Sequence, residues 1–290
     1  RWRRSSAQRA IPSPRATSSL SSNSETLGGG KLRLDYPAEA VARLTLSRPD
    51  ARNALDHETL DAIAAAIARL DDGIKFRCVI LTGEGKAFSA GYDIAAIPEE
   101  SFERDAESLV AHPFAAALDA IANHPWPVVG ALNGHALGGG LELALCCDLR
   151  LCATGAKLGM PPAKLGLIYG HTGLRRFIET IGIPETRRLF FTGRSIDAGD
   201  AQRIGLVHET VDGGRLEASA LDLAAEIAAN APVSMRGNKQ AISTLAANPT
   251  LSPEQERGLV ELRQSCFASE DFREGIAAFA EKRKPQWKGR

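Results

Sequence analysis

Short apolar runs alternate with segments of helical periodicity through the first half of the chain. The β-branched runs Cys78–Thr82 and Pro127–Leu132 predict buried strands, and the spacing of Ala, Ile and Leu over His57–Leu70 predicts an amphipathic helix. This alternation indicates an α/β core with mainly parallel strand pairing. The other expected elements are strands at Lys31–Tyr36, Val41–Ser47 and Asp148–Ala153, a long helix at Phe102–Asn123 that ends before Pro125, and a short apolar helix at Leu141–Cys147 after the glycines Gly138–Gly140.

The chain is mostly helical after Asp197. Helices are expected at Ala198–Ile204, Arg215–Asn230, Val233–Leu245, Glu254–Ala268 and Asp271–Lys282. We therefore expect three regions: a tail over residues 1–30, a core over residues 31–230 and a helical region over residues 231–290. Helices attached to the end of an α/β core provide a natural surface for a second subunit.

Charge is spread unevenly along the chain. The first 30 residues hold five Arg and one Glu, are rich in Ser, and close on three glycines, which predicts a disordered Arg/Ser-rich tail. The remaining 260 residues carry a net charge of −4, so they offer no basic face for nucleic acid or for an anionic membrane.

The cysteine content indicates the compartment in which the protein is expected. The chain has five cysteines, an odd number, and no CxxC pair, which indicates reduced thiols in the cytoplasm rather than disulfides or a metal site. The tail has the composition of an organelle transit peptide, so organelle targeting is the alternative. No apolar run reaches the roughly 18 residues that cross a membrane.

Two glycine-rich segments follow the two buried strands. The first is KAFSAGYDI over residues 86–94, and the second is NGHALGGGLE over residues 133–142. Small residues let backbone amides approach a ligand closely, and helix starts leave amides without internal partners. Two such loops could each supply one N–H to a thioester oxygen and stabilise an enolate.

Four segments resemble the enoyl-CoA hydratase/isomerase (crotonase) superfamily. AFSAGYDI and NGHALGGGLELALCCDLRL are similar to its two signature loops, RPDARNAL to its CoA-embracing segment, and the segment from Ser269 to its C-terminal helix. The resemblance covers Lys31 to Arg290. It implies a crotonase-like spiral of ββα units, an acyl-CoA site in the core, and a C-terminal helical region that forms a homotrimer or a dimer of trimers. CoA is then part of the substrate, and neither a separate cofactor nor a metal is implied.

The resemblance also assigns roles to individual residues. By position, Ala90 and Gly139 match the amides of the oxyanion hole. Residues expected to bind CoA are Arg52, Ala54, Leu55, Phe88 and Ser89 around the groove, with Phe279 and Lys282 completing the site, often from a neighbouring subunit.

Glu142 matches the first of two glutamates that hydratases of this superfamily use. It interrupts an apolar helix start, where desolvation would raise its pKa toward a range useful for acid–base chemistry. The alternative is a helix-surface glutamate without a catalytic role. The second glutamate should lie within residues 159–166, where this chain has Pro162. Because hydratases hold water between two carboxylates and isomerases keep their base at the second position, this departure argues against both reactions.

The segment MPPAKLGLIYG is similar to methylmalonyl-CoA decarboxylases of the superfamily, in which a tyrosine matching Tyr169 orients the substrate carboxylate. Decarboxylation needs an oxyanion hole, an orienting group and a proton donor, but no base. Tyr92, Tyr169 and His171 are candidates for the last two roles, with purely structural roles as the alternative. We therefore favour a decarboxylase or lyase reaction on a short acyl-CoA, with a hydratase or isomerase that uses Glu142 as the alternative.

Other classes of protein are less well supported by the sequence. A serine hydrolase would need a base beside Ser89, and no GxSxG segment surrounds this residue. One branch of the superfamily binds RNA through a lysine-rich helix, but the matching helix here has few cations. A non-catalytic homologue that binds acyl-CoA or RNA remains the alternative from another class, and a small-molecule acyl-CoA is the expected partner.

Overall fold

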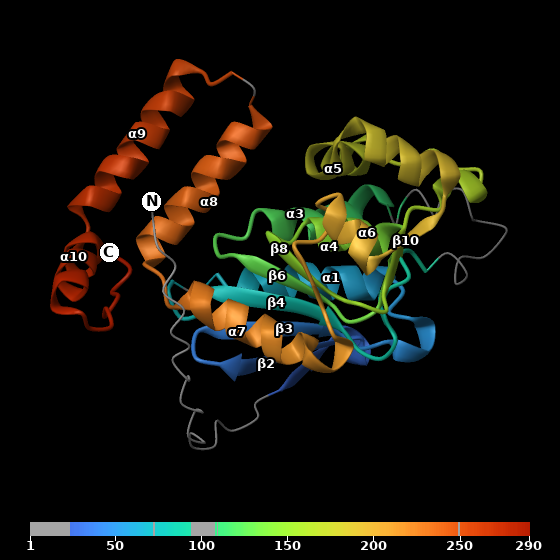
Figure 1. Cartoon of the computed structure of the whole chain (residues 1–290), viewed down its shortest axis with the longest axis horizontal. Coiled ribbons are helices and arrows are strands. Elements are labelled where there is room, and N and C mark those ends of the chain that lie inside the picture. Colours follow the sequence, from blue (N-terminus) through green and yellow to red (C-terminus); the bar gives the residue numbers. More distant parts are fainter. Residues whose placement is uncertain (1–23, 72, 94–107, 109, 249) are drawn as a thin grey trace, which may run out of the picture.

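Two β-sheets lie at the centre of the computed structural model, which describes residues 24–71, 73–93, 108, 110–248 and 250–290 (Figure 1). The larger sheet has the order β1-β2-β3-β4-β6-β8-β11 and the smaller β10-β9-β7-β5. The strands are β1 (Glu25–Leu27), β2 (Leu32–Ala38), β3 (Val41–Leu46), β4 (Cys78–Gly83), β5 (Ala87–Ser89), β6 (Val128–Leu132), β7 (His135–Leu137), β8 (Leu149–Ala153), β9 (Lys157–Gly159), β10 (Ser195–Asp197) and β11 (Glu209–Val211).

Most strand pairs are parallel, as the sequence predicts. Pairing is parallel from β3 through β4, β6 and β8 to β11, and also from β5 through β7 to β9. The pairs β1–β2, β2–β3 and β9–β10 are antiparallel. Every residue of β6 is buried, which explains why its sequence is a continuous apolar run rather than an alternating one.

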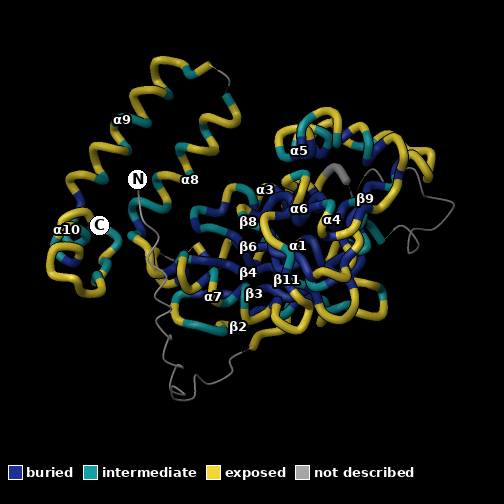
Figure 2. Tube along the Cα trace, in the orientation of Figure 1, coloured by how far each residue is buried: buried dark blue, intermediate teal, exposed yellow. Residues whose placement is uncertain are grey.

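Helices cover both faces of the larger sheet. Cys78 and Ile80 of β4 pack against α7, whereas Val79 and Leu81 point to the opposite face, against α1, α3 and α4. Figure 2 shows the resulting buried centre. The helices are α1 (His57–Arg69), α3 (Ala115–Ala122), α4 (Gly139–Leu145), α5 (His171–Thr192), α6 (Ala198–Arg203), α7 (Leu216–Ala228), α8 (Pro232–Ala247), α9 (Pro253–Ala268) and α10 (Glu270–Glu281).

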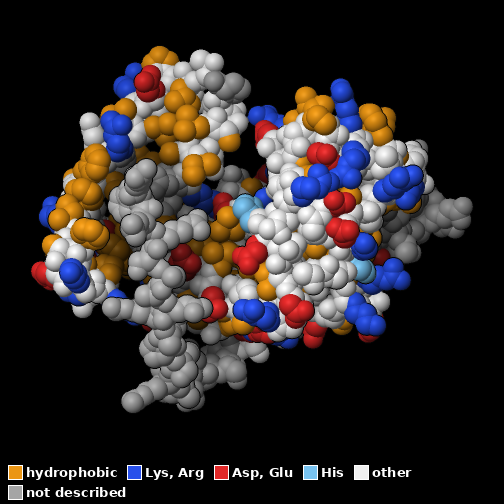
Figure 3. Space-filling model, viewed as in Figure 1, with side chains coloured by type: hydrophobic (Ala, Val, Ile, Leu, Met, Phe, Trp, Pro, Cys, Tyr) orange, Lys and Arg blue, Asp and Glu red, His pale blue; other side chains and the backbone are white. Residues whose placement is uncertain are grey.

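Helices α8, α9 and α10 form an arm that projects from the core (Figure 1). The arm contacts the core through few polar bonds, among them Lys239 Nζ to Asp148 Oδ2 at 2.7 Å and Trp287 Nε1 to the Ala229 carbonyl at 2.7 Å. Hydrophobic side chains gather on its surface (Figure 3), and Phe279 is 88% exposed. This helical region was expected from the sequence.

The predicted disorder of residues 1–30 is wrong at the C-terminal end of that segment. Glu25–Leu27 pairs with β2 and forms the edge of the larger sheet, and Gly28–Gly30 forms a 3-10 turn against α1. All three glycines have positive φ angles, a conformation that glycine adopts without a steric penalty. Residues 1–23 lie outside the described residues.

Two further elements differ from the expectation. Part of the predicted helix over Phe102–Asn123 lies outside the described residues, and within the described part a π-helical turn, Val110–Phe114, precedes α3. Helix α5 was not predicted. It is two helical halves joined by a kink at Gly182, which has φ 72°, and Pro184 lies two residues further on. The kink interrupts the periodicity by which a long helix is recognised.

Candidate active site

The two glycine-rich segments lie side by side because β5 and β7 pair in parallel, so the loops after both strands leave the same edge. Gly91 and Gly139 approach each other closely there. A Cβ atom on Gly91 would lie 2.8 Å from the Leu137 carbonyl oxygen and 3.0 Å from the Gly139 amide nitrogen. Gly91 also has φ 92°, so both its conformation and its surroundings require glycine.

The amide hydrogen bonds of these loops correct one sequence-based assignment. The Ala90 N–H, expected in the oxyanion hole, donates to the Arg52 carbonyl at 2.9 Å and is not free for a ligand. Within the described part of the chain, the amides of Tyr92 and Gly139 donate to no acceptor. The unused pair of donors is therefore Tyr92 and Gly139 rather than Ala90 and Gly139.

Glu142 lies on α4, a short helix whose seven residues are all buried. The residue is 3% exposed, and its Oε2 accepts a hydrogen bond of 2.6 Å from the Tyr169 hydroxyl. On the other side, Arg176 Nε lies 3.7 Å from Oε1. Burial raises the pKa of Glu142, because desolvation outweighs the hydrogen bond from Tyr169 and the charge of Arg176. The surface alternative for Glu142 is excluded by this burial.

Helix α5 can approach Glu142 only because its first turn contains a glycine. A Cβ atom on Gly173 would lie 2.5 Å from Tyr169 Cε1 and 2.8 Å from Glu142 Oε2. The helix also supplies Arg176, whose Nη2 donates to Asp119 Oδ1 of α3 at 3.0 Å. Neither Gly173 nor Arg176 was identified from the sequence, since the helix that carries them was not predicted.

Tyr92 and Tyr169 lie together beside the unused amides. The Tyr92 ring packs edge-on against Phe114 with 4.7 Å between ring centroids, and a Cβ atom on Gly139 would lie 3.2 Å from Tyr92 Cζ. Burial and the nearby Glu142 charge raise the pKa of Tyr92, so its hydroxyl stays protonated at neutral pH.

His171, a candidate from the sequence, is exposed at the first position of α5. Pro162, at the position of the missing second glutamate, is buried at the start of a 3-10 turn. The structure therefore joins Tyr92, Gly139, Glu142 and Tyr169, but it leaves His171 at the surface.

A hollow of about 720 Å³ opens beside the first loop. Arg52, Lys86 and His135 line it together with Ala90 and Leu137. The remaining residues expected at the CoA groove are buried: Ala54, Leu55, Phe88 and Ser89. Their side chains support the groove from within, so contact with a ligand there would have to come from the backbone.

Asn53 organises this region, although no role was predicted for it from the sequence. The residue is 1% exposed with φ 54°, and its side-chain oxygen accepts from the Arg48 amide at 2.8 Å. Its side-chain nitrogen, Nδ2, donates to the Glu84 carbonyl at 3.0 Å and to the Ala87 carbonyl at 2.7 Å. The Ser89 hydroxyl in turn donates to the Asn53 carbonyl at 2.8 Å, which gives Ser89 a structural role.

Phe279 and Lys282 lie at the end of α10, at the opposite side of the molecule from α5 (Figure 1). A single chain therefore does not bring them to the site described above, and their predicted role in CoA binding stays a prediction.

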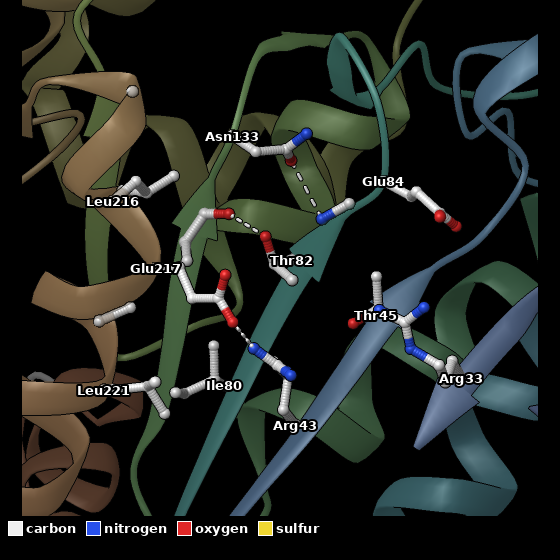
Figure 4. Close-up of a pocket in the computed structure, with 14 residues that line it drawn as sticks. Arg33, Arg43, Thr45, Ile80, Thr82, Glu84, Asn133, Leu216, Glu217 and Leu221 are labelled. Atoms are coloured by element: carbon white, nitrogen blue, oxygen red, sulfur yellow. Dashed lines mark hydrogen bonds and ion pairs between the residues drawn. The ribbon is translucent and has the colours of Figure 1, made fainter. Parts of the chain in front are cut away.

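A second hollow, of about 290 Å³, lies on the α7 side of the larger sheet (Figure 4). Arg43 in its wall pairs with Glu217 of α7 and also with Asp35 of β2. The Thr82 hydroxyl donates to the Ala131 carbonyl at 2.7 Å. These contacts tie α7 to the sheet and place no acid–base group beside an unused amide.

Among the described residues, no helix is long and apolar enough to cross a membrane. The same residues contain no cluster of three His, Cys, Asp or Glu side chains that could hold a metal ion.

Comparison with known proteins identifies the family. The enoyl-CoA hydratase/isomerase family model matches residues 37–290. The short-chain-enoyl-CoA hydratase of Clostridium acetobutylicum is 35% identical over 249 residues, which cover 84% of this chain and 92% of the relative. YngF of Bacillus subtilis, named as an enoyl-CoA hydratase/isomerase, is 40% identical over 90% of this chain and 99% of its own length.

Solved structures agree with this match. The crystal structure of an enoyl-CoA hydratase from Bacillus anthracis has a TM-score of 0.80 and 34% identity, over 90% of this chain and all of that one. The crotonase-like α/β fold expected from the signature loops is therefore confirmed. The chain belongs to the enoyl-CoA hydratase/isomerase (crotonase) family, whose members process acyl-CoA thioesters.

Proposed function

We propose that this protein hydrates a 2-enoyl-CoA, with Glu142 as the acid–base group. The observation that carries the proposal is the buried Glu142 carboxylate, which accepts a hydrogen bond from the Tyr169 hydroxyl. Glu142 lies on α4, the short helix that begins at Gly139 with its unused amide. A carboxylate whose pKa is raised by burial can take up and return a proton within one catalytic cycle.

Besides an acid–base group, the reaction requires donors that stabilise the enolate oxygen, and the unused amides of Tyr92 and Gly139 supply them. A thioester carbonyl becomes negatively charged at oxygen when the substrate forms an enolate, and fixed N–H donors stabilise that charge in a site from which water is excluded. The opposing glycines Gly91 and Gly139 let the two amides converge. We propose these two amides as the oxyanion hole.

One carboxylate is sufficient for the proton balance. As water adds to Cβ, one of its protons passes to Glu142 and the hydroxyl forms the new carbon–oxygen bond. The resulting enolate then takes a proton at Cα, which returns Glu142 to its charged form. Isomerisation of a 3-enoyl-CoA would use the same cycle, with a proton removed from Cα and returned to Cγ. With Pro162 in place of the second glutamate, the site has one carboxylate fewer to bind water, but the proton transfers can still take place.

The contact between Tyr169 and Glu142 supports hydration over decarboxylation. Our preferred assignment from the sequence required Tyr169 to orient a substrate carboxylate. Its single hydroxyl proton is directed to Glu142 instead, and the charge of Glu142 would repel a second carboxylate. Decarboxylation and a non-catalytic binding role remain outcomes that the experiment below distinguishes.

The CoA portion of the substrate would lie over the hollow beside the first loop. Arg52 and Lys86 line this hollow and can bind the phosphates of CoA. We further propose that Phe279 and Lys282 reach this site from another copy of the chain in a homotrimer or a dimer of trimers, because the arm carries them away from their own core.

A panel of acyl-CoAs followed by mass spectrometry tests the proposal. With crotonyl-CoA we expect the gain of one water, at a typical enzymatic rate of about 10 s⁻¹. Glu142→Gln should abolish turnover while CoA binding is retained. Loss of carbon dioxide from methylmalonyl-CoA without hydration of crotonyl-CoA would overturn the proposal, as would unchanged turnover by the folded Glu142→Gln variant.

A further inference from the structure

Arg176 lies between two carboxylates that come from different helices. Its Nη2 donates to Asp119 Oδ1 of α3 at 3.0 Å, and its Nε lies 3.7 Å from Glu142 Oε1 of α4. The second distance is too long for a hydrogen bond, so Arg176 acts on Glu142 through its charge. Among the described residues, no atom accepts a hydrogen bond from the Arg176 Nε, although this nitrogen is buried.

The guanidinium of Arg176 is held in this intermediate position. Phe177, the next residue of α5, is fully buried and packs edge-on against Phe190 with 5.1 Å between the ring centroids, which fixes this turn of the helix against the core. A buried N–H without an acceptor is unfavourable, and closing the gap to Glu142 would satisfy it. The hydrogen bond to Asp119, at the other end of the same planar group, opposes that movement.

Arg176 is also the charged group that faces Glu142 at neutral pH. The titratable side chains around this carboxylate are Tyr169 from the loop before α5, Tyr92 from the loop after β5, Cys146 from α4 and Arg176 from α5. Burial raises the pKa of both tyrosines and of the Cys146 thiol, so these three groups are neutral. In the described part of the chain, Arg176 therefore supplies the positive charge that stabilises the carboxylate form of Glu142, and Asp119 partly neutralises that charge.

We propose that Arg176 is a positioning residue that keeps Glu142 charged in the resting site without pairing with it, and that Asp119 sets the distance between them. This role rests on the proposed function, in which Glu142 first accepts a proton from water. Without a cation nearby, the buried carboxylate would keep its own proton and could not act as a base. A hydrogen-bonded cation would instead lower its affinity for the proton that it must receive. Arg176 at 3.7 Å avoids both extremes.

Two substitutions at this pair should move the titration of Glu142 in opposite directions. Arg176→Met removes the cation at a similar side-chain length, so the pKa of Glu142 should rise. Asp119→Asn keeps an oxygen that can accept from Arg176 but removes the opposing negative charge, so the pKa of Glu142 should fall. The Asp119 side chain is 62% exposed, so this variant should fold normally. Loosening of the structure would instead admit water and lower the pKa of Glu142 in both variants.

Infrared spectroscopy measures this titration without any turnover. The carbonyl stretch of a protonated carboxyl group, taken as the part of the spectrum that is lost in Glu142→Gln, gives the protonated fraction of Glu142 at each pH. We expect a wild-type midpoint above the ordinary Glu value of 4.5, a higher midpoint in Arg176→Met and a lower one than wild type in Asp119→Asn. Arg175→Met, the same change at the neighbouring residue, breaks only the exposed pair with Glu179 and should leave the midpoint unchanged. A midpoint that does not rise in Arg176→Met, or does not fall in Asp119→Asn, overturns the inference.

Kinetics on crotonyl-CoA provide a second test. Because the base must be charged, kcat/KM falls as the pH drops through the pKa of Glu142. In Arg176→Met this fall should begin at higher pH, with kcat/KM about tenfold below wild type on the acid side and within about twofold of wild type at high pH. A loss that is equal at every pH would indicate a purely structural role, which refutes the inference and leaves the proposed function standing. If the wild type converts no enoyl-CoA, the proposed function fails, and the infrared titration alone decides the role of Arg176.

Discussion

Gly173→Ala should damage the site although alanine is the better helix former. In a helix interior, alanine is more stable than glycine by about 1 kcal/mol. The new methyl group, however, would lie 2.5 Å from Tyr169 Cε1 and 2.8 Å from Glu142 Oε2. Carbon contacts are optimal at about 3.5–4.0 Å, so the Tyr169 ring must retreat by roughly 1 Å. Such overpacking costs about 1–3 kcal/mol.

The two effects nearly cancel in stability but not in activity. We expect a loss of about 0–2 kcal/mol in the free energy of unfolding, measured by urea denaturation. A displacement of about 1 Å at a reacting group costs about 100-fold in rate, so kcat on crotonyl-CoA should fall by that factor. Gly258→Ala in α9 is the matched control, since no atom lies within 4 Å of its Cβ position. It should gain up to about 1 kcal/mol without loss of rate. Wild-type turnover by Gly173→Ala would refute the assigned contact between Tyr169 and Glu142.

Three further predictions address the amide pair, the start of α1 and the arm. Gly139→Pro should lower kcat by about 100-fold to 1,000-fold through loss of one donor, whereas Gly139→Ala, which keeps the amide, should lose clearly less; equal losses would count against the amide. Asp56 caps α1 through a 2.9 Å bond from the Thr59 amide, and Asp56→Ala should cost about 1–2 kcal/mol by urea denaturation at pH 7. Burial opposes ionisation of Asp56, but Lys31 and Thr59 outweigh it and lower the pKa to about 2. Its contribution is therefore present above pH 3.8 and is lost as the pH falls toward 2, so a deficit that persists at pH 2 contradicts the assignment. Light scattering at micromolar concentration should report a trimer or hexamer, with Phe279→Asp shifted toward monomer, and a monomeric wild type would contradict this.

The parts of the fold that follow from local pattern were predictable. The strands β4 and β6 are continuous apolar runs because they are buried on both faces, and α1 has a regular apolar stripe. The smaller sheet was not predicted, since each of its strands has only three residues and pairs with segments distant in the chain. Periodicity cannot identify elements that short.

The candidate site was likewise predictable from the sequence only in part. Glu142 was identifiable as a carboxylate within an apolar helix, and its burial and raised pKa agree with that reasoning. The choice between the amides of Ala90 and Tyr92 was not identifiable, because a hydrogen bond to Arg52, distant in sequence, decides it. Likewise, the bond from Tyr169 to Glu142 depends on the approach of α5 at Gly173. Tertiary contacts, rather than local residue type, determine both.

The strand order of the larger sheet has a consequence for biosynthesis. Along the sheet from β1 to β11, each strand is later in the chain than its neighbour, so the strands emerge from the ribosome in the order in which they pair. Each new strand can join the edge left by the previous one, which keeps a single growing edge open at any moment. The arm, with its exposed apolar side chains, is translated after the core. A nascent chain can thus complete its core before the exposed apolar side chains of the arm are translated.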